Sequence, residues 1–80
     1  MYILKRTFDH IELEGSVSRS FNRRGKPTGE GPVKGSRLMV THNRTWGCTE
    51  EITEILEQKD DNYFKFNTIN GTIWEWTKLQ

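Results

Sequence analysis

The dipeptide Asn70-Gly71 lies between two segments in which apolar and polar residues alternate, and both segments are rich in aromatic residues. Alternation with a period of two is typical of a half-buried strand, and Asn-Gly is the strongest short marker of a hairpin with a two-residue turn. The sequence therefore predicts an antiparallel hairpin with strands over residues 62–69 and 72–79. Whatever the rest of the chain folds into has to pack against this pair.

A two-residue turn also determines which side chains share a face, because it places Ile69 opposite Thr72. The predicted core face carries Phe64, Phe66, Ile73 and Leu79. The opposite face carries Tyr63, Trp74 and Trp76 interleaved with Lys65 and Lys78. Exposed aromatic rings stack nucleobases, at about 1 to 3 kcal/mol per base, while ammonium groups contact phosphates. The alternative is that a strongly twisted sheet buries Trp74 or Trp76 as a core residue.

Period-two alternation predicts strands over residues 2–8 and 10–14, and further strands are expected over residues 36–41 and 51–58. The apolar residues of the first two strands change parity between Phe8 and Ile11, which indicates a bulge or bend near Asp9-His10.

Residues 49–59 fit two kinds of secondary structure. Ile52, Ile55 and Leu56 have the spacing of a helix face. Their β-branched character, and the turn over residues 60–62 that leads into a clear strand, favour a strand in a hairpin. We favour the strand.

Residues 18–35 contain four glycines, both prolines and few apolar side chains. This composition predicts a long irregular loop, and residues 42–47 predict another connection. Loops of this length are uncommon in compact domains unless they are functional or disordered, so activity is first sought here.

The charges are strongly segregated along the chain, although the net charge is only +1. Residues 17–45 carry seven cationic residues and one acidic residue, whereas the first sixteen residues carry a net −1 and the last 35 a net −4. Such a basic block attracts an anionic partner, or it is a solvated loop kept open by its own repulsion. The candidate phosphate-binding cations are Arg23, Arg24, Lys26, Lys34, Arg37 and Arg44.

The sequence shows no motif of an enzyme or a metal site. The glycine-rich residues 29–36 fail the Walker pattern, because Lys34 precedes Gly35. Cys48 and His42 are the only nucleophile and base that could act together, and no third residue marks an orienting partner. One cysteine and two histidines cannot supply a Cys/His zinc site or an intrachain disulfide. We therefore predict a non-enzymatic protein without cofactor or metal.

A chain of 80 residues predicts a single domain over residues 1–80. It has no apolar run long enough to cross a membrane, and its first residues lack the apolar segment of a signal peptide. We expect a soluble cytoplasmic protein with no membrane partner. Aromatic-rich edge strands in so small a domain are also compatible with a homodimer, although no self-complementary pattern marks one.

Three segments, residues 52–57, 63–68 and 70–74, resemble the C-terminal half of small SH3-like β-barrel proteins encoded by bacteriophages and mobile elements. This resemblance implies a five-stranded, partly open barrel. It also implies binding to a host molecule in the host cytoplasm, including anti-CRISPR and other anti-defence roles.

The expected fold is mainly β, a small SH3-like barrel or antiparallel meander with one long basic loop. The leading hypothesis is a binding protein that engages nucleic acid or nucleotide phosphates through the basic loop and the aromatic-lysine face. The alternative is a phage-type inhibitor that binds a host nucleic-acid-processing protein. It would use the basic loop against an acidic groove, or the acidic C-terminal half as a mimic of nucleic acid.

Overall fold

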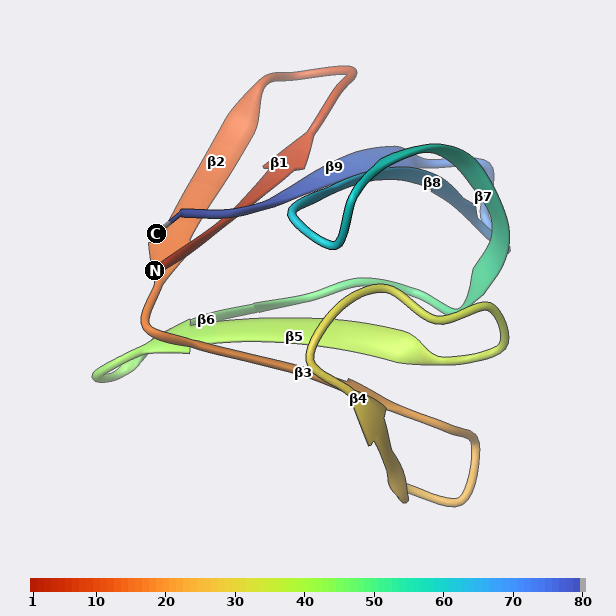
Figure 1. The fold of residues 1–80 in the computed structure, drawn as a ribbon, viewed down its shortest axis with the longest axis horizontal. Coiled ribbons are helices and arrows are strands. Elements are labelled where there is room, and N and C mark those ends of the chain that lie inside the picture. The colour runs from red at the N-terminus through yellow and green to blue at the C-terminus, as the bar shows by residue number, and fades with distance from the viewer. Residues whose placement is uncertain (80) are drawn as a thin grey trace.

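In the computed structural model, which describes residues 1–79, the chain forms nine strands and no helix (Figure 1). The predicted mainly β class is confirmed. Sheet A has the order β2-β1-β9-β8-β7 and consists of β1 (Tyr2–Arg6), β2 (Ile11–Gly15), β7 (Ile52–Lys59), β8 (Tyr63–Thr68) and β9 (Ile73–Lys78). Sheet B has the order β4-β3-β5-β6 and consists of β3 (Val17–Phe21), β4 (Pro27–Gly29), β5 (Arg37–His42) and β6 (Thr45–Cys48). Residues 1–79 include no helix with the length and apolar character needed to cross a membrane.

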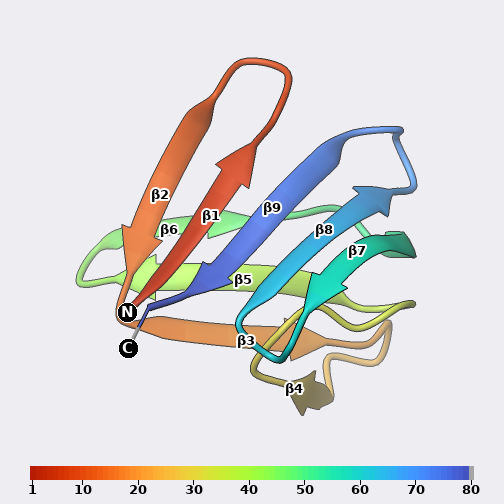
Figure 2. The ribbon, with the colours of Figure 1, turned by 45° about the horizontal axis from the view of Figure 1, so that its top comes forward.

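The two sheets form two layers, with the strands of sheet A crossing those of sheet B at an angle (Figure 2). The buried core lies between them and comprises Leu4, Leu38, Val40, Ile52, Phe66 and Trp76. Backbone hydrogen bonds join the sheets at two corners. Ser16 N donates to Thr41 O at 2.9 Å where β2 continues into β3, and Ile52 N donates to Ser36 O at 2.8 Å where β7 begins.

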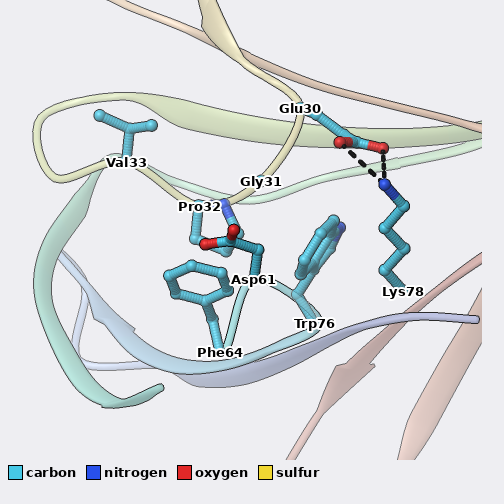
Figure 3. Close-up of a pocket in the computed structure, with 8 residues that line it drawn as sticks. All are labelled: Glu30, Gly31, Pro32, Val33, Asp61, Phe64, Trp76 and Lys78. Carbon is cyan, nitrogen blue, oxygen red and sulfur yellow. Dashed lines mark hydrogen bonds and ion pairs between the residues drawn. The ribbon is translucent and has the colours of Figure 1, made fainter. Parts of the chain in front are cut away.

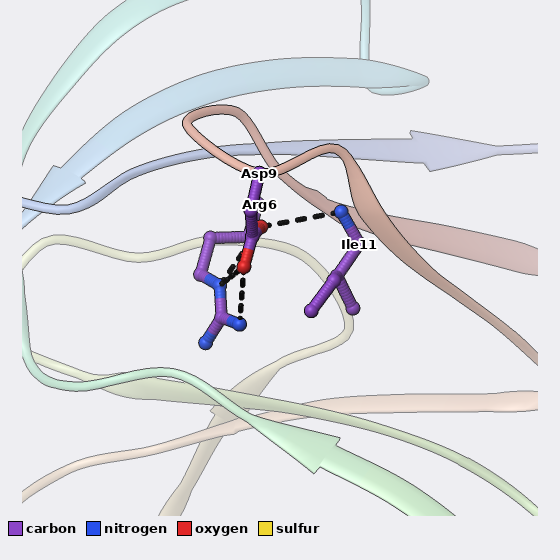
Figure 4. Close-up of polar contacts among 3 residues, drawn as sticks. All are labelled: Arg6, Asp9 and Ile11. Atoms are coloured by element: carbon purple, nitrogen blue, oxygen red, sulfur yellow. Dashed lines mark hydrogen bonds and ion pairs between the residues drawn. The ribbon is translucent and has the colours of Figure 1, made fainter.

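The strands predicted at 2–8, 10–14, 36–41 and 51–58 are confirmed as β1, β2, β5 and β7, with shifts at their ends. The segment with two interpretations, residues 49–59, is therefore mostly a strand. The bend expected near Asp9-His10 is the reversal of a β1–β2 hairpin, in which His10 has φ 59°. Asp9 stabilises this reversal, because its carboxylate accepts from the Arg6 guanidinium at 2.6 Å and from Ile11 N at 3.2 Å (Figure 4).

The C-terminal hairpin is confirmed, but its predicted register is wrong by one residue. Thr68 N donates to Thr72 O, and Gly71 N donates to Thr68 O with Gly71 at φ 81°. The loop therefore holds three residues, with glycine in the left-handed position that such loops require. The side-chain oxygen of Asn70 stabilises this loop by accepting from Thr68 Oγ1 at 2.6 Å and from Thr72 N at 3.3 Å.

The shifted register moves both tryptophans of β9 to the inner face of sheet A. Phe66 lies opposite Trp74, and Phe64 lies opposite Trp76. A slip of one residue transfers every side chain of a strand to the other face. Ile73 consequently leaves the predicted core face, and the alternative in which the sheet buries Trp76 is confirmed, because Trp76 is 1% exposed.

The long irregular loop predicted over residues 18–35 is wrong, because β3 and β4 lie within it. Residues 17–21 do alternate, but the positions that face the core are Ser18 and Ser20 instead of apolar residues. Ser18 Oγ donates to Glu30 O at 2.7 Å, and Ser20 Oγ donates to Gly31 O. The connection predicted over residues 42–47 is likewise shorter, since β6 begins at Thr45 after a two-residue loop.

Candidate nucleic-acid interface

The outer face of sheet B combines arginine and aromatic side chains, and we call it the arginine–tryptophan face. In the strand pairing, Arg19 lies opposite Met39, and Met39 lies opposite Cys48. These three side chains therefore lie in one row across β3, β5 and β6. The neighbouring positions Leu38 and Val40 point the other way, into the core. The complete face consists of Val17, Arg19, Phe21, Arg37, Met39, Thr41, Trp46 and Cys48. Trp46 is 67% exposed, which makes it the most exposed tryptophan on the molecule.

One end of this face is hollowed into a cavity of about 480 Å³. Its apolar part is formed by Phe21, Trp46 and Cys48, and its cationic part is formed by Arg23 and Arg37. A volume of this size lies within the range of about 300 to 1,000 Å³ that is typical of small-ligand pockets. The cavity therefore offers a planar ligand an aromatic surface and an anionic ligand two guanidinium groups.

The two arginines of this cavity are held by different contacts. Arg37 donates from Nε to Thr49 O at 3.0 Å. Arg23 donates from Nε and Nη2 to the Glu51 carboxylate, at 2.8 and 3.2 Å. The hydrogen bond from Arg23 lowers the pKa of Glu51, so the carboxylate stays ionised and competes with any anion for this guanidinium.

A tight turn between β3 and β4 presents the remaining cations of this end. The Asn22 side-chain oxygen accepts from Arg24 N at 2.9 Å and from Lys26 N at 3.0 Å. Gly25 has φ 78°, a conformation that glycine adopts at low cost. The sequence Asn-Arg-Arg-Gly-Lys therefore builds an ordered turn with exposed cationic side chains.

The predicted cations thus lie at several places around sheet B. Arg23, Arg24, Lys26 and Arg37 are gathered at the end where the cavity lies. Arg44 lies in the β5–β6 loop at the opposite end of β5, and Lys34 is exposed in the segment between β4 and β5. Of the six predicted cations, Arg23 and Arg37 line the cavity together with Trp46.

The predicted aromatic-lysine face is not formed, because Tyr63 and Lys65 lie on the outer side of sheet A while Trp74 and Trp76 lie on the inner side. Trp76 donates from Nε1 to Ser18 Oγ at 2.9 Å and stacks against Tyr2 with ring centroids 5.7 Å apart. Tyr63 donates to Glu75, and its burial together with this bond raises its pKa to about 12. Because Trp76 is buried, it is not available to stack a base.

Lys65 belongs to a row of alternating charges across the outer face of sheet A. The opposed residues, taken from β2 to β7, are Glu12, Lys5, Glu75, Lys65 and Glu57. Directly opposed charges of unlike sign stabilise neighbouring strands. We call this row the charge ladder, and it places Lys65, one of the two lysines of the predicted binding face, between Glu75 and Glu57.

A second cavity, of about 330 Å³, lies where residues 30–33 cross the end of β8 and β9 (Figure 3). The rings of Phe64 and Trp76 point toward this segment, and Glu30 is paired with Lys78 at 3.1 Å. Two carboxylates, from Glu30 and Asp61, line this cavity, and its one ammonium group is already paired. This arrangement does not favour an anionic ligand.

The residues weighed for catalysis do not meet. His42 lies opposite Thr45, and Cys48 lies opposite Met39, so the two side chains are separated by three positions along the β5–β6 hairpin. At about 3.3 Å per residue this corresponds to about 10 Å. Within residues 1–79, no group of three His, Cys, Asp or Glu side chains is placed to hold a metal ion.

Of the eight residues of this face, sequence reasoning identified only Arg37 as a candidate, and those it missed include Arg19, Phe21 and Trp46. The sequence predicts a connection at Trp46, and the residue that indicates a strand there instead is Asn43, which has φ 53° in the structure. Asparagine tolerates this backbone conformation in tight turns, so residues 42–45 can form a hairpin loop. Trp46 and Cys48 then fall on the same face.

Comparison with protein-family models, with curated proteins and with solved structures finds no significant match to this chain.

Proposed function

We propose that this protein binds nucleic acid through the arginine–tryptophan face, and that its role is binding without catalysis. The observation that carries the proposal is Trp46, 67% exposed, lining a cavity together with Arg23 and Arg37. An exposed indole stacks any base, because every base has a π face, while guanidinium groups bind phosphate and also stack. An aromatic surface next to cations is the usual composition of such sites.

The distribution of charge supports the same face. Residues 17–45, with a net charge of +6, form three of the four strands of sheet B, and the rest of the chain carries a net −5. The segregation along the sequence therefore becomes a segregation between the two layers (Figure 1). Such a field turns the basic layer toward a polyanion and speeds association.

The first test is a fluorescence titration with single-stranded oligothymidylate at low and high salt. Trp46→Ala is expected to weaken binding by about 1 to 3 kcal/mol, or about 5- to 150-fold, because one base loses its stacking partner. Trp46→Phe should retain part of the affinity. The exposure of Trp46 means that neither variant should change the midpoint of urea unfolding by much.

The dependence of binding affinity on salt concentration distinguishes a nucleic-acid ligand from a protein partner. Binding to a single strand should weaken with a log–log slope of about −0.7 for each phosphate contacted. Arg37→Ala should reduce that slope by about one contact, whereas Lys59→Ala removes the same charge from sheet A and should leave it unchanged. Absence of oligonucleotide binding at low salt would contradict the proposal and favour the alternative, a protein partner.

Replacing Glu51 by glutamine is expected to strengthen binding several-fold at low salt. The Glu51 carboxylate occupies the guanidinium of Arg23, and its removal leaves that cation for a phosphate. The matched control is Glu54→Gln, which removes an exposed carboxylate from β7. Equal affinities of the Glu51→Gln variant and the wild type in the same titration would show that Arg23 makes no phosphate contact.

A further inference from the structure

Two cavities meet at β6, the edge strand of sheet B. The first is the cavity of the arginine–tryptophan face. The second has a volume of about 280 Å³ and is distinct from the cavity beside Glu30 and Lys78 that Figure 3 shows. Trp46 and Cys48 line both of them. Trp46 is 67% exposed and lies at the border that the two cavities share.

The second cavity differs from the first in chemistry. Its walls include the apolar side chains of Ile11, Leu13 and Trp74, together with Arg6 and Glu12. The guanidinium of Arg6 is already paired with Asp9 at 2.6 Å and lies 5.8 Å from the Trp74 ring centroid. Glu12 adds a carboxylate, so this cavity suits an uncharged planar group better than a phosphate.

These two cavities carry an inference that rests on the proposed function. We infer that Trp46 inserts between two neighbouring unpaired bases, so that the ligand class is single-stranded nucleic acid. One base occupies the cavity with Arg23 and Arg37, which contact the phosphates, and the adjacent base occupies the apolar cavity beside Ile11 and Leu13.

The spacing of the bases explains the preference for a single strand. A ring between two bases holds each of them at about 3.5 Å, so the bases lie about 7 Å apart. This is about twice the separation of 3.4 Å within a duplex strand. A duplex would have to unstack a base step to reach this spacing, whereas a flexible single strand reaches it readily.

The test uses single-stranded hexamers with equal numbers of phosphates, in which abasic residues replace selected bases. Adding a second base directly next to the first should strengthen binding to the protein at least fivefold. The gain in affinity should be smaller when one abasic residue separates the two bases. Ile11→Asp, which places a charge in the second cavity, should remove this gain. Ile69→Asp puts the same charge on the exposed β8–β9 loop, and the gain should remain.

The outcomes separate this inference from the proposed function. Salt-dependent binding with no gain from the adjacent base, or equal affinity for a duplex, overturns the insertion of Trp46 and leaves the proposed function standing. Retention of the gain in Ile11→Asp overturns the assignment of the second cavity. No binding of any hexamer at low salt overturns both.

Discussion

Replacing Trp76 by alanine is expected to lower the free energy of unfolding by about 3 to 5 kcal/mol, the usual cost of truncating a buried aromatic side chain. Trp76 is the largest fully buried side chain, and its ring contacts those of Tyr2 and Phe64. Its indole N–H also donates to Ser18, whose hydroxyl donates to Glu30 O. A domain of this size has a total stability of about 4 to 12 kcal/mol, so the substitution should remove a large fraction of it.

Urea unfolding followed by circular dichroism measures this effect. Trp76→Phe keeps most of the apolar contact and loses the hydrogen bond, so it should be affected less than the alanine variant. Trp46→Ala is the matched control, because it truncates an exposed tryptophan of the same protein. Similar midpoints for Trp76→Ala and Trp46→Ala would contradict the placement of Trp76 in the core.

Replacing Gly15 by alanine is expected to destabilise the fold by about 3 kcal/mol or more, at the upper end of the cost of overpacking. A Cβ at this position would lie 2.5 Å from Val40 Cγ1 and 2.6 Å from Thr41 O. The carbonyl cannot move away freely, because it accepts the Ser16 N–H that joins the two sheets at this corner.

Gly47→Ala provides the comparison for this substitution in the same urea experiment. Its Cβ would meet Leu13 Cδ2 at 2.9 Å, the far end of a flexible side chain that can rotate away. The Gly47 variant should therefore lose less stability than the Gly15 variant. An unchanged unfolding midpoint for Gly15→Ala would show that the corner between β2 and β3 is not as close-packed as described.

Much of the fold was predictable because it depends on local alternation. Both strands of the C-terminal hairpin follow from their own residues, yet the faces they present depend on the length of a single loop. Asn70-Gly71 is compatible with a two-residue turn and with a three-residue loop. The side-chain bonds of Asn70 to Thr68 and Thr72 favour the longer loop, and this difference reverses the faces of Trp74 and Trp76.

The sequence allowed the cations of the candidate site to be predicted, but not its aromatic residues. A block of charge is visible in composition alone, so Arg23 and Arg37 were found. Strand β3 was missed because its core-facing residues are serines, whose hydroxyls donate to the carbonyls of residues 30 and 31. Without β3 and β6 as strands, the sequence offered no surface on which Phe21 and Trp46 could be placed together.

The charge ladder on sheet A also affects how two copies of this protein can meet. Its two ends, Glu12 on β2 and Glu57 on β7, are both acidic and lie on the edge strands of the sheet. A second copy that extended the sheet in line with the ladder would place glutamate against glutamate, and like charges directly opposite are destabilising. The ladder thereby disfavours this one mode of strand addition while it stabilises the strands between its ends.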